Sequence, residues 1–430
     1  MTQDNPDGDV RRTRRLTTIA VGACIALLLA GCADDEGGHQ FANAPRPTSV
    51  ATPTAFAVTP PPMATPEPVK SVAFADLIAP RGGPDRVFFR AGHDLWTIGA
   101  DGSEPHPVFV PESGQRIIDS SPSPSGDRVA VLIAEADGAT SVKTLRPDGS
   151  VEMAREAIGR SLPDAPPEPE TIDWSPQGDK LLIGFRDELL TLSAKPGPSP
   201  TPVFGDSPTL APVGATWSPT GEEIAFLAPR APDGARALYV AGVGSAAATP
   251  QPVLPEADDR SVLSYAWMPD GRSLLFTEGT LPGGAAASAD LWRVRADGEG
   301  RELIASAGAA APVAQIATVA PSPDGAAVAY PVTVPGETGV AFHSLWVREL
   351  ATGKAYQLVI PEQQAVTDLW WTSKGLVIRT VPGETDARYD GGSFDLYLVS
   401  SPNESRLLFQ AASAATPVAS PAATPVIGSP

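Results

Sequence analysis

A four-residue phrase, Ser-Pro-x-Gly, recurs along this chain at nearly regular intervals. Its copies, one of them opening on Met and the last one degraded, begin at Ser123, Ser175, Ser218, Met268, Ser322 and Thr372. Their final glycines lie 52, 43, 50, 54 and 50 residues apart. Proline fixes φ and glycine accepts a positive φ, so each phrase predicts a tight turn between two strands. Self-similarity at this period indicates a fold made of stacked, similar units.

Each turn leads into short apolar runs with the period-two alternation of β-strands. In one unit the turn is followed by residues 274–276 (Leu-Leu-Phe), residues 290–294 (Asp-Leu-Trp-Arg-Val), a second turn at 296–298 and a last short strand at 303–304. Four strands per unit, with almost no helical pattern, predict an all-β fold in which each unit is a β-propeller blade. Residues 71–410 hold about seven such units. Six or eight blades stay open, because ring closure often borrows a strand from the opposite terminus.

The first unit contains the fullest copy of the pattern. Residues 94–109 read Asp-Leu-Trp-Thr-Ile-Gly-Ala-Asp-Gly-Ser-Glu-Pro-His-Pro-Val-Phe, although Gly82-Gly83-Pro84 stands where the turn phrase is expected. This pattern resembles the TolB-like, or WD40-like (PD40), propeller repeat, and the resemblance covers residues 71–410. It implies a propeller fold. Members of that family include periplasmic binding and scaffolding proteins, propellers of actinobacterial lipoproteins and gating domains of prolyl peptidases.

The N-terminus has the order of features found in a bacterial export signal. A basic stretch, residues 11–15, precedes an apolar run, residues 16–30, that is too short for a comfortable membrane span. The run ends in Leu-Ala-Gly-Cys, which resembles a lipobox, so we predict that residues 1–31 are a lipoprotein signal peptide and that Cys32 carries lipid. An ordinary secretory signal, or a membrane anchor, with an incidental cysteine is the alternative. Paired arginines leave Sec or twin-arginine export open.

Both ends of the chain differ in composition from the repeat region. Residues 32–70 form a Pro/Thr/Ala-rich linker, with eight prolines between residues 44 and 68. Such a stretch favours extended polyproline II and suits a stalk, with plain disorder as the alternative. Residues 411–430 carry no charge and repeat Ala-Thr-Pro-Val. They predict a disordered tail.

Charge and reactive residue types narrow the function classes. The chain has 31 Lys and Arg against 50 Asp and Glu, a net charge of −19, which argues against a nucleic-acid partner. Its two cysteines, Cys24 and Cys32, lie near the N-terminus, and its four histidines lack metal-ligand spacing. No nucleophile elbow, P-loop or dinucleotide-binding motif occurs. We therefore expect no cofactor and no metal, and a role without catalysis, although propeller enzymes assemble sites from several blades that no local motif reveals.

Three carboxylates precede the turn phrases at similar offsets, namely Asp119, Asp173 and Asp368. Residues near the start of an inner strand face the central channel, so these three are candidates for a carboxylate ring that binds a cation or a basic ligand. Hydrogen bonds to neighbouring blades are the simpler interpretation, and we favour it. The tryptophans before the turns are likewise expected in the core between blades rather than in a ligand cage.

These observations predict a lipid-anchored β-propeller on the extracytoplasmic side of the cell membrane, with a protein partner at the envelope. The alternative is a solute- or glycan-binding propeller, with or without a hydrolytic site in its central channel.

Overall fold

The computed structural model describes residues 72–411, apart from 81, 157, 159–168, 186–187, 198, 205–209, 231–234, 245–248, 256–259, 281–288, 310–313, 335–341, 363 and 383–392, together with residues 426–427. All of them belong to one compact unit, residues 67–430. The predicted signal peptide, Cys32 and the linker to residue 70 lie outside the described residues, as does most of the predicted tail.

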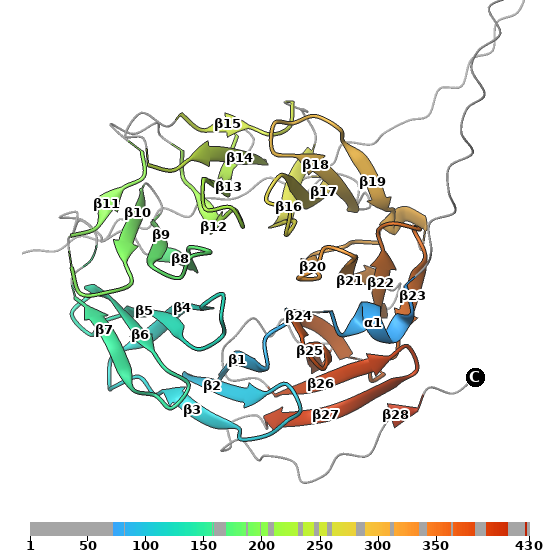
Figure 1. The fold of residues 1–430 in the computed structure, drawn as a ribbon, viewed down its shortest axis with the longest axis horizontal. Helices are drawn as coiled ribbons and strands as arrows, with labels where there is room; N and C mark the ends of the chain where they lie inside the picture. The colour runs from blue at the N-terminus through green and yellow to red at the C-terminus, as the bar shows by residue number, and fades with distance from the viewer. Residues whose placement is uncertain are drawn as a thin grey trace, which may run out of the picture. The chain divides into compact units, whose positions relative to one another are not determined.

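Seven antiparallel sheets stand around a common centre, as Figure 1 shows, and the sequence prediction of seven blades is confirmed. We number the blades in chain order. Blade 1 consists of β1 (Arg86–Ala91), β2 (Asp94–Gly99) and β3 (His106–Phe109). Blade 2 consists of β4 (Arg116–Pro122), β5 (Val129–Ala134), β6 (Thr140–Leu145) and β7 (Val151–Arg155). Blade 3 consists of β8 (Pro169–Trp174), β9 (Lys180–Phe185), β10 (Leu189–Ser193) and β11 (Thr201–Pro202).

The remaining blades repeat this inner-to-outer order. Blade 4 consists of β12 (Val213–Trp217), β13 (Glu223–Pro229), β14 (Arg236–Gly242) and β15 (Gln251–Pro252). Blade 5 consists of β16 (Arg260–Trp267), β17 (Ser273–Thr280), β18 (Asp290–Arg295) and β19 (Glu302–Ala305). Blade 6 consists of β20 (Ala320–Pro321), β21 (Ala327–Val334), β22 (Phe342–Glu349) and β23 (Ala355–Leu358). Blade 7 consists of β24 (Gln364–Thr372), β25 (Gly375–Pro382), β26 (Phe394–Ser401), β27 (Glu404–Ala411) and β28 (Val426–Ile427).

Helical structure is scarce among these residues. The only helical elements described are α1 (Phe74–Ile78) and one 3₁₀ turn, η1 (Ala307–Ala309). Within the described part of the chain, no helix has both the length and the apolar character needed to cross a membrane. The short strand β28 pairs with β27, inside the stretch for which the sequence predicted no element.

The repeated phrase forms the turn between the first and second strands of a blade. In blade 2, the Gly126 N–H donates to the Ser123 carbonyl at 2.8 Å, and Gly126 has a φ of +71°. The Ser123 Oγ accepts the backbone N–H of Arg128 at 3.1 Å, which fixes the first residues of the next strand. Blades 3, 4 and 6 repeat these bonds at Ser175, Ser218 and Ser322. The serine hydroxyl and the glycine backbone therefore explain why the phrase recurs.

The apolar core is divided among the contacts between consecutive blades, which we call seams. Seven clusters of buried side chains are present in the described residues, and each joins two neighbouring blades. The seam between blades 7 and 1 closes the ring, where the Phe89 ring contacts Phe409 edge-on at a centroid distance of 5.0 Å. Burial of apolar surface at every seam supplies the main driving force for the ring.

Ring closure uses backbone contacts as well as the core. The Ser373 N–H of blade 7 donates to the Pro84 carbonyl at 3.1 Å. Gly83 lies so close to this turn that a Cβ on it would stand 2.6 Å from the carbonyl carbon of Thr372. The Gly-Gly-Pro sequence that replaces the turn phrase in the first unit thus permits a close approach between the first and last blades.

Candidate functional site

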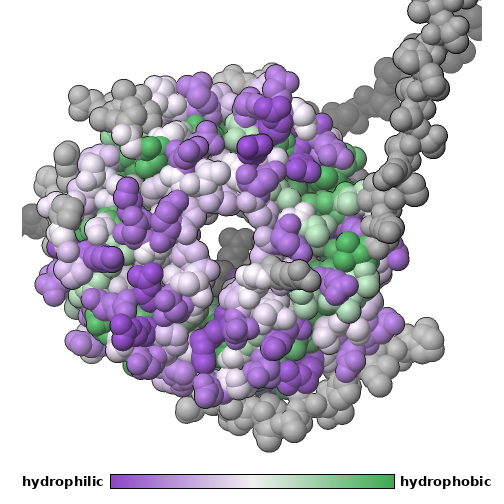
Figure 2. All heavy atoms as spheres, in the orientation of Figure 1, coloured by the Kyte–Doolittle hydropathy of each residue, from purple (hydrophilic) through white to green (hydrophobic). Residues whose placement is uncertain are grey.

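The centre of the ring is the first place to look for a site. The space-filling view shows an opening there, bordered mainly by hydrophilic and near-neutral residues (Figure 2). The inner strands of blades 2 to 7 face it in Figure 1, namely β4, β8, β12, β16, β20 and β24. The three predicted carboxylates all lie on these inner strands.

Asp119 joins blade 2 to blade 3. It lies at a register shift in the pairing of β4 with β5. Its Oδ2 accepts the backbone N–H of Ile172 on β8 at 2.9 Å, and its Oδ1 accepts the N–H of Ser120 at 2.8 Å. Burial raises the pKa of the Asp119 carboxyl above its usual value, against these hydrogen bonds and the nearby positive charge of Arg90.

Asp173 makes the corresponding connection one blade further on. Its Oδ2 accepts the backbone N–H of Trp217 on β12 at 2.9 Å, and its Oδ1 accepts the Ser121 hydroxyl of blade 2 at 3.2 Å. One carboxylate therefore links three consecutive blades. Asp173 is partly buried, and the surrounding strands exclude most water from its carboxylate. That desolvation, with a smaller contribution from the Asp119 charge, raises the pKa of Asp173 to about 7.

Asp368 does not join this pair. Its Oδ2 accepts the Thr367 hydroxyl of the same strand at 2.9 Å, and its backbone pairs with Arg379 of β25. The interblade hydrogen bonds that the sequence analysis favoured are thus present at Asp119 and Asp173, whereas Asp368 bonds within its own blade. Binding of a ligand to any of the three stays a prediction.

Tyr265 extends the same polar wall, and the sequence analysis did not single it out. It lies on β16 of blade 5, and its hydroxyl donates to the Ala225 carbonyl of blade 4 at 2.6 Å. The Thr216 hydroxyl of blade 4 donates to it at 3.2 Å. Burial raises the pKa of Tyr265 above its usual range, and the charge of Asp173 acts in the same direction. The signal available in the sequence was a lone tyrosine three residues before a turn phrase, where the other units carry Ser, Ile, Ala, Val or Leu.

The tryptophans before the turns lie between blades, as predicted. Trp174 and Trp371 are 3% and 6% exposed, and each indole N–H donates at 2.9 Å to a carbonyl of the preceding blade, on Ser121 and Ala320 respectively. Trp217 and Trp267 are equally enclosed, but their indole N–H groups find no acceptor among the described residues. These four rings pack the seams and do not form a cage around the opening.

Of the three described histidines, His93 and His106 lie on blade 1 and His343 on blade 6. His106 contacts the Pro147 carbonyl through Nε2 at 2.8 Å, and His343 contacts the Thr333 hydroxyl through Nδ1 at 3.1 Å. Within the described ranges, no group of three His, Cys, Asp or Glu side chains is arranged to hold a metal ion.

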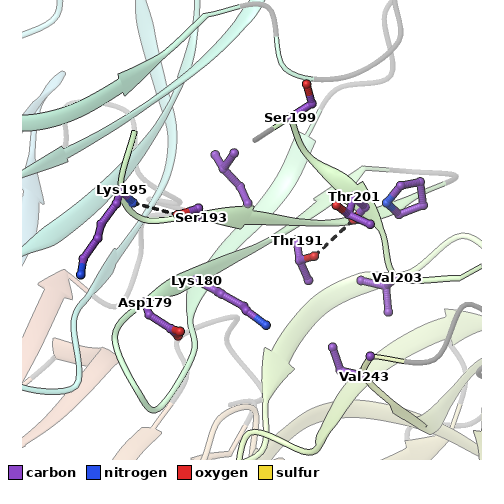
Figure 3. A pocket seen from close by; sticks show the side chains of 12 residues that line it. Asp179, Lys180, Thr191, Ser193, Lys195, Ser199, Thr201, Val203 and Val243 are labelled. Carbon is purple, nitrogen blue, oxygen red and sulfur yellow. Dashed lines mark hydrogen bonds between the residues drawn. The ribbon is translucent and has the colours of Figure 1, made fainter. Parts of the chain in front are cut away.

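A second candidate lies between the outer parts of blades 3 and 4. This groove, with a volume of about 600 Å³, combines lysines with hydroxyl-bearing side chains (Figure 3). Its polar lining consists of Asp179, Lys180, Thr191, Ser193, Lys195, Ser199 and Thr201. The whole chain has only six lysines, so two of them in one groove make a local exception to the acidic composition.

Comparisons with known proteins support the fold. A scan against models of protein families finds no match, and a search among curated proteins finds none either. Among solved structures, an oligogalacturonate lyase in complex with manganese has 14% sequence identity and a TM-score of 0.51, covering 74% of this chain and 83% of its own. An oligogalacturonate lyase from Vibrio parahaemolyticus has 12% identity and a TM-score of 0.50, covering 75% and 84%.

A TolB from Agrobacterium tumefaciens is also similar, with 18% identity and a TM-score of 0.43, covering 61% of this chain and 84% of its own. Identities this low speak to the fold alone. The seven sheets and the seven closed seams, together with the similarity to the two oligogalacturonate lyases, identify this chain as a seven-bladed β-propeller.

Proposed function

We propose that this chain is a protein-binding propeller, held at the extracytoplasmic face of the cell membrane by lipid on Cys32. The observation that carries the proposal is the set of hydrogen bonds that two carboxylates, Asp119 and Asp173, accept beside the central opening. Asp119 and Asp173 each accept one backbone N–H of the next blade through Oδ2, and their Oδ1 atoms accept hydrogen bonds from Ser120 and Ser121, so the wall of the opening serves as a frame. A frame closed by seven apolar seams holds the ends of its strands in fixed positions, which suits a surface that recognises another macromolecule.

The membrane anchor rests on the sequence. Replacing Cys32 by Ser removes the thiol to which lipid would be attached. We expect wild-type protein to sediment with membranes at high salt and Cys32→Ser protein to become soluble. Replacing Cys24 by Ser is the matched control and leaves fractionation unchanged, because residue 24 lies within the predicted signal. Membrane association of Cys32→Ser protein at high salt would contradict the anchor.

The protein partner is tested by crosslinking. Tagged full-length protein is crosslinked in intact cells, purified from the envelope, and compared with an unrelated lipoprotein that bears the same tag. We expect a small set of envelope proteins to be enriched only with the propeller. Recovery of the same proteins with both baits would count against a specific partner.

The groove of Figure 3 favours a second candidate function, the binding of an acidic glycan. Lys180 and Lys195 offer positive charge beside several hydroxyl groups, a combination that suits carboxylated sugars. The lyases that share this fold are named for oligogalacturonate, which makes galacturonate oligosaccharides the natural probe.

Calorimetry tests this second function. We expect oligogalacturonate to bind, Lys195→Gln to weaken binding several-fold, and Lys354→Gln on the distant blade 6 to leave it unchanged. Incubation with the same sugar, followed by analysis of product length, tests for a hydrolytic site in the channel. If none of the three proteins binds the sugar, the groove is not a site for acidic glycans.

A further inference from the structure

Blade 1 differs from the other six blades at its inner edge. Each of blades 2 to 7 has an inner strand paired with its second strand, whereas the described part of blade 1 begins with β1, which is equivalent to those second strands. In Figure 1, β1 faces the central opening with no strand arrow between them. Within the described residues, β1 pairs only with β2.

The register of β1 with β2 shows which backbone groups of β1 point away from β2, toward the inner edge of the blade. The Ala100 N–H donates to the Asp85 carbonyl at 2.8 Å, so residues 85 and 100 are a hydrogen-bonded pair. Alternation along the ladder turns the N–H and C=O groups of Val87 and Phe89 toward β2 and those of Arg86 and Phe88 toward the inner edge. No described residue forms a hydrogen bond with these inner-edge groups of Arg86 or Phe88. An edge of this kind is a template for another strand.

The segment that precedes β1 in sequence is used elsewhere. In the sequence alignment of the units, residues 74–80 correspond to the inner strands of blades 2 to 7. In the structure, however, residues 74–78 form the helix α1. Leu77 and Ile78 are each 1% exposed in the seam between blades 6 and 7, and Phe74 contacts Tyr356 of blade 6 at a centroid distance of 4.8 Å. Val72 donates its N–H to Glu349 of blade 6 at 2.7 Å. This segment is therefore committed to the opposite side of blade 7 from β1.

The rest of the chain is poorly suited to fill the edge. Residues 44–68 contain eight prolines, each without the N–H that a ladder requires. At the other end, β28 pairs with β27, which is the outer side of blade 7. The proline content of residues 44–68 and the pairing of β28 with β27 therefore favour a strand from another polypeptide.

The side chains beside the inner edge of β1 indicate what kind of segment would fit there. On one side lies the seam with blade 2, which contains Phe88, Phe109 and Ile117. On the other lies the seam with blade 7, where Trp96 and Trp370 are only partly buried. Apolar side chains flank both faces of this inner position, which no described strand fills, so the fitting segment is extended, free of proline and apolar at alternate residues.

We propose that β1 accepts an extended segment of a protein partner as the inner strand of blade 1. This inference rests on the proposed protein-binding function and specifies where the partner binds and that it binds by adding a strand. Main-chain hydrogen bonds to Arg86 and Phe88 would supply affinity, and the two apolar seams would select the side chains.

A pair of variants at Arg86 isolates the backbone contribution. Arg86→Pro removes the inner-edge N–H without removing a bond to β2, whereas Arg86→Ala keeps that N–H. Both lose the same ion pair with Glu104, 3.1 Å long in the native protein. The probe is a blocked synthetic peptide with the sequence of β16, an inner strand free of proline. It is added at millimolar concentration to full-length protein.

Hydrogen exchange at the Phe88 amide is the main measurement. We expect fast exchange in the full-length protein alone, and at least tenfold slower exchange with peptide for wild type and Arg86→Ala, but not for Arg86→Pro. Slow exchange without peptide that becomes fast after removal of residues 1–71 would overturn the proposal, since this chain would then fill its own edge. Lack of protection by the peptide would also overturn it.

The envelope crosslinking experiment, repeated with both Arg86 variants, separates this inference from the proposed function. Loss of the captured partner with Arg86→Pro alone supports both. Equal capture by both variants leaves the protein-binding function standing and overturns the role of β1. If no partner is captured by any form, the proposed function fails, whatever the peptide does.

Discussion

The Asp173 carboxylate on β8 accepts the backbone N–H of Trp217 on β12 at 2.9 Å, and so joins the inner strands of two consecutive blades beside the central opening. The same carboxylate accepts the Ser121 hydroxyl of the preceding blade. Its pKa of about 7 means that this connection changes its charge near neutral pH.

Stability should therefore depend on pH through Asp173. The pKa of this acid is raised from 3.8 to about 7 in the folded protein, so the folded state binds more protons than the unfolded state between those values. The contribution of protonated Asp173 to the free energy of unfolding is full below pH 3.8 and is lost as pH rises through about 7. The free energy of unfolding falls with a slope of at most about 1.4 kcal/mol per pH unit.

Asp173→Asn removes this dependence, because asparagine stays neutral and keeps an acceptor for the Trp217 N–H. Urea unfolding at pH 5 and pH 8 should show a smaller decline for Asp173→Asn than for wild type. The control is Asp148→Asn, a turn residue whose pKa lies below its usual value and which does not titrate in this window. Equal declines in wild type and Asp173→Asn would contradict the prediction.

The tryptophans at the seams offer a matched comparison. Trp174→Phe keeps an aromatic ring but deletes the hydrogen bond to the Ser121 carbonyl, whereas Trp217→Phe deletes an indole N–H that has no described acceptor. We expect Trp174→Phe to lower the free energy of unfolding by about 1 kcal/mol more than Trp217→Phe. Denaturant titration of both variants measures the difference. A larger loss for Trp217→Phe would show that packing, and not the hydrogen bond, dominates at this position.

Ring closure should be sensitive to one of two adjacent glycines. A Cβ at Gly83 would meet the Thr372 backbone at 2.6 Å, while a Cβ at Gly82 would meet nothing within 4 Å. Gly82→Ala costs only the strain of a positive φ, about 1 kcal/mol. Gly83→Ala must also push blades 1 and 7 apart, so it should destabilise the protein more and speed hydrogen exchange in β1. Similar melting temperatures for the two variants would be the contrary result.

Glu278 should be costly to neutralise. It is 4% exposed, and its Oε2 lies 3.2 Å from Arg260 and 2.5 Å from Arg301. Glu278→Gln leaves two guanidinium groups without their shared charge, and we expect a loss of about 2 kcal/mol, less than for a fully buried pair because both arginines reach solvent. The control, Asp297→Asn, breaks the exposed pair with Arg295 and should cost under about 0.5 kcal/mol. Equal losses, compared by urea unfolding, would contradict the prediction.

Much of the fold was predictable because the repeat acts locally. Ser123 and Gly126 form their turn with neighbours a few residues away, so the sequence of four residues fixes the geometry. Where Met268 replaces the serine, Asp270 accepts the N–H groups of Arg272 and Ser273 instead, and the turn persists. The turn of each blade therefore depends on its own local sequence, and a count of turns and strands predicted about seven blades.

The polar wall was less predictable, because it depends on contacts between residues 40 to 53 positions apart. Asp119, Asp173 and Asp368 look alike in sequence, yet only the first two reach the next blade. Tyr265 reaches blade 4 from blade 5 and has no local signal beyond its aromatic side chain.

The blades follow from local sequence, since turn chemistry and strand alternation act over a few residues. The arrangement where the ring closes depends instead on contacts between distant segments. Residues 74–78 align with the inner strands of the other units, but they bury Leu77 and Ile78 against blades 6 and 7 as a helix. Among the described residues, β1 pairs only with β2, and it faces the opening in Figure 1. Which of two apolar surfaces a segment joins depends on where the last blade comes to rest beside the first, and no local pattern encodes that position.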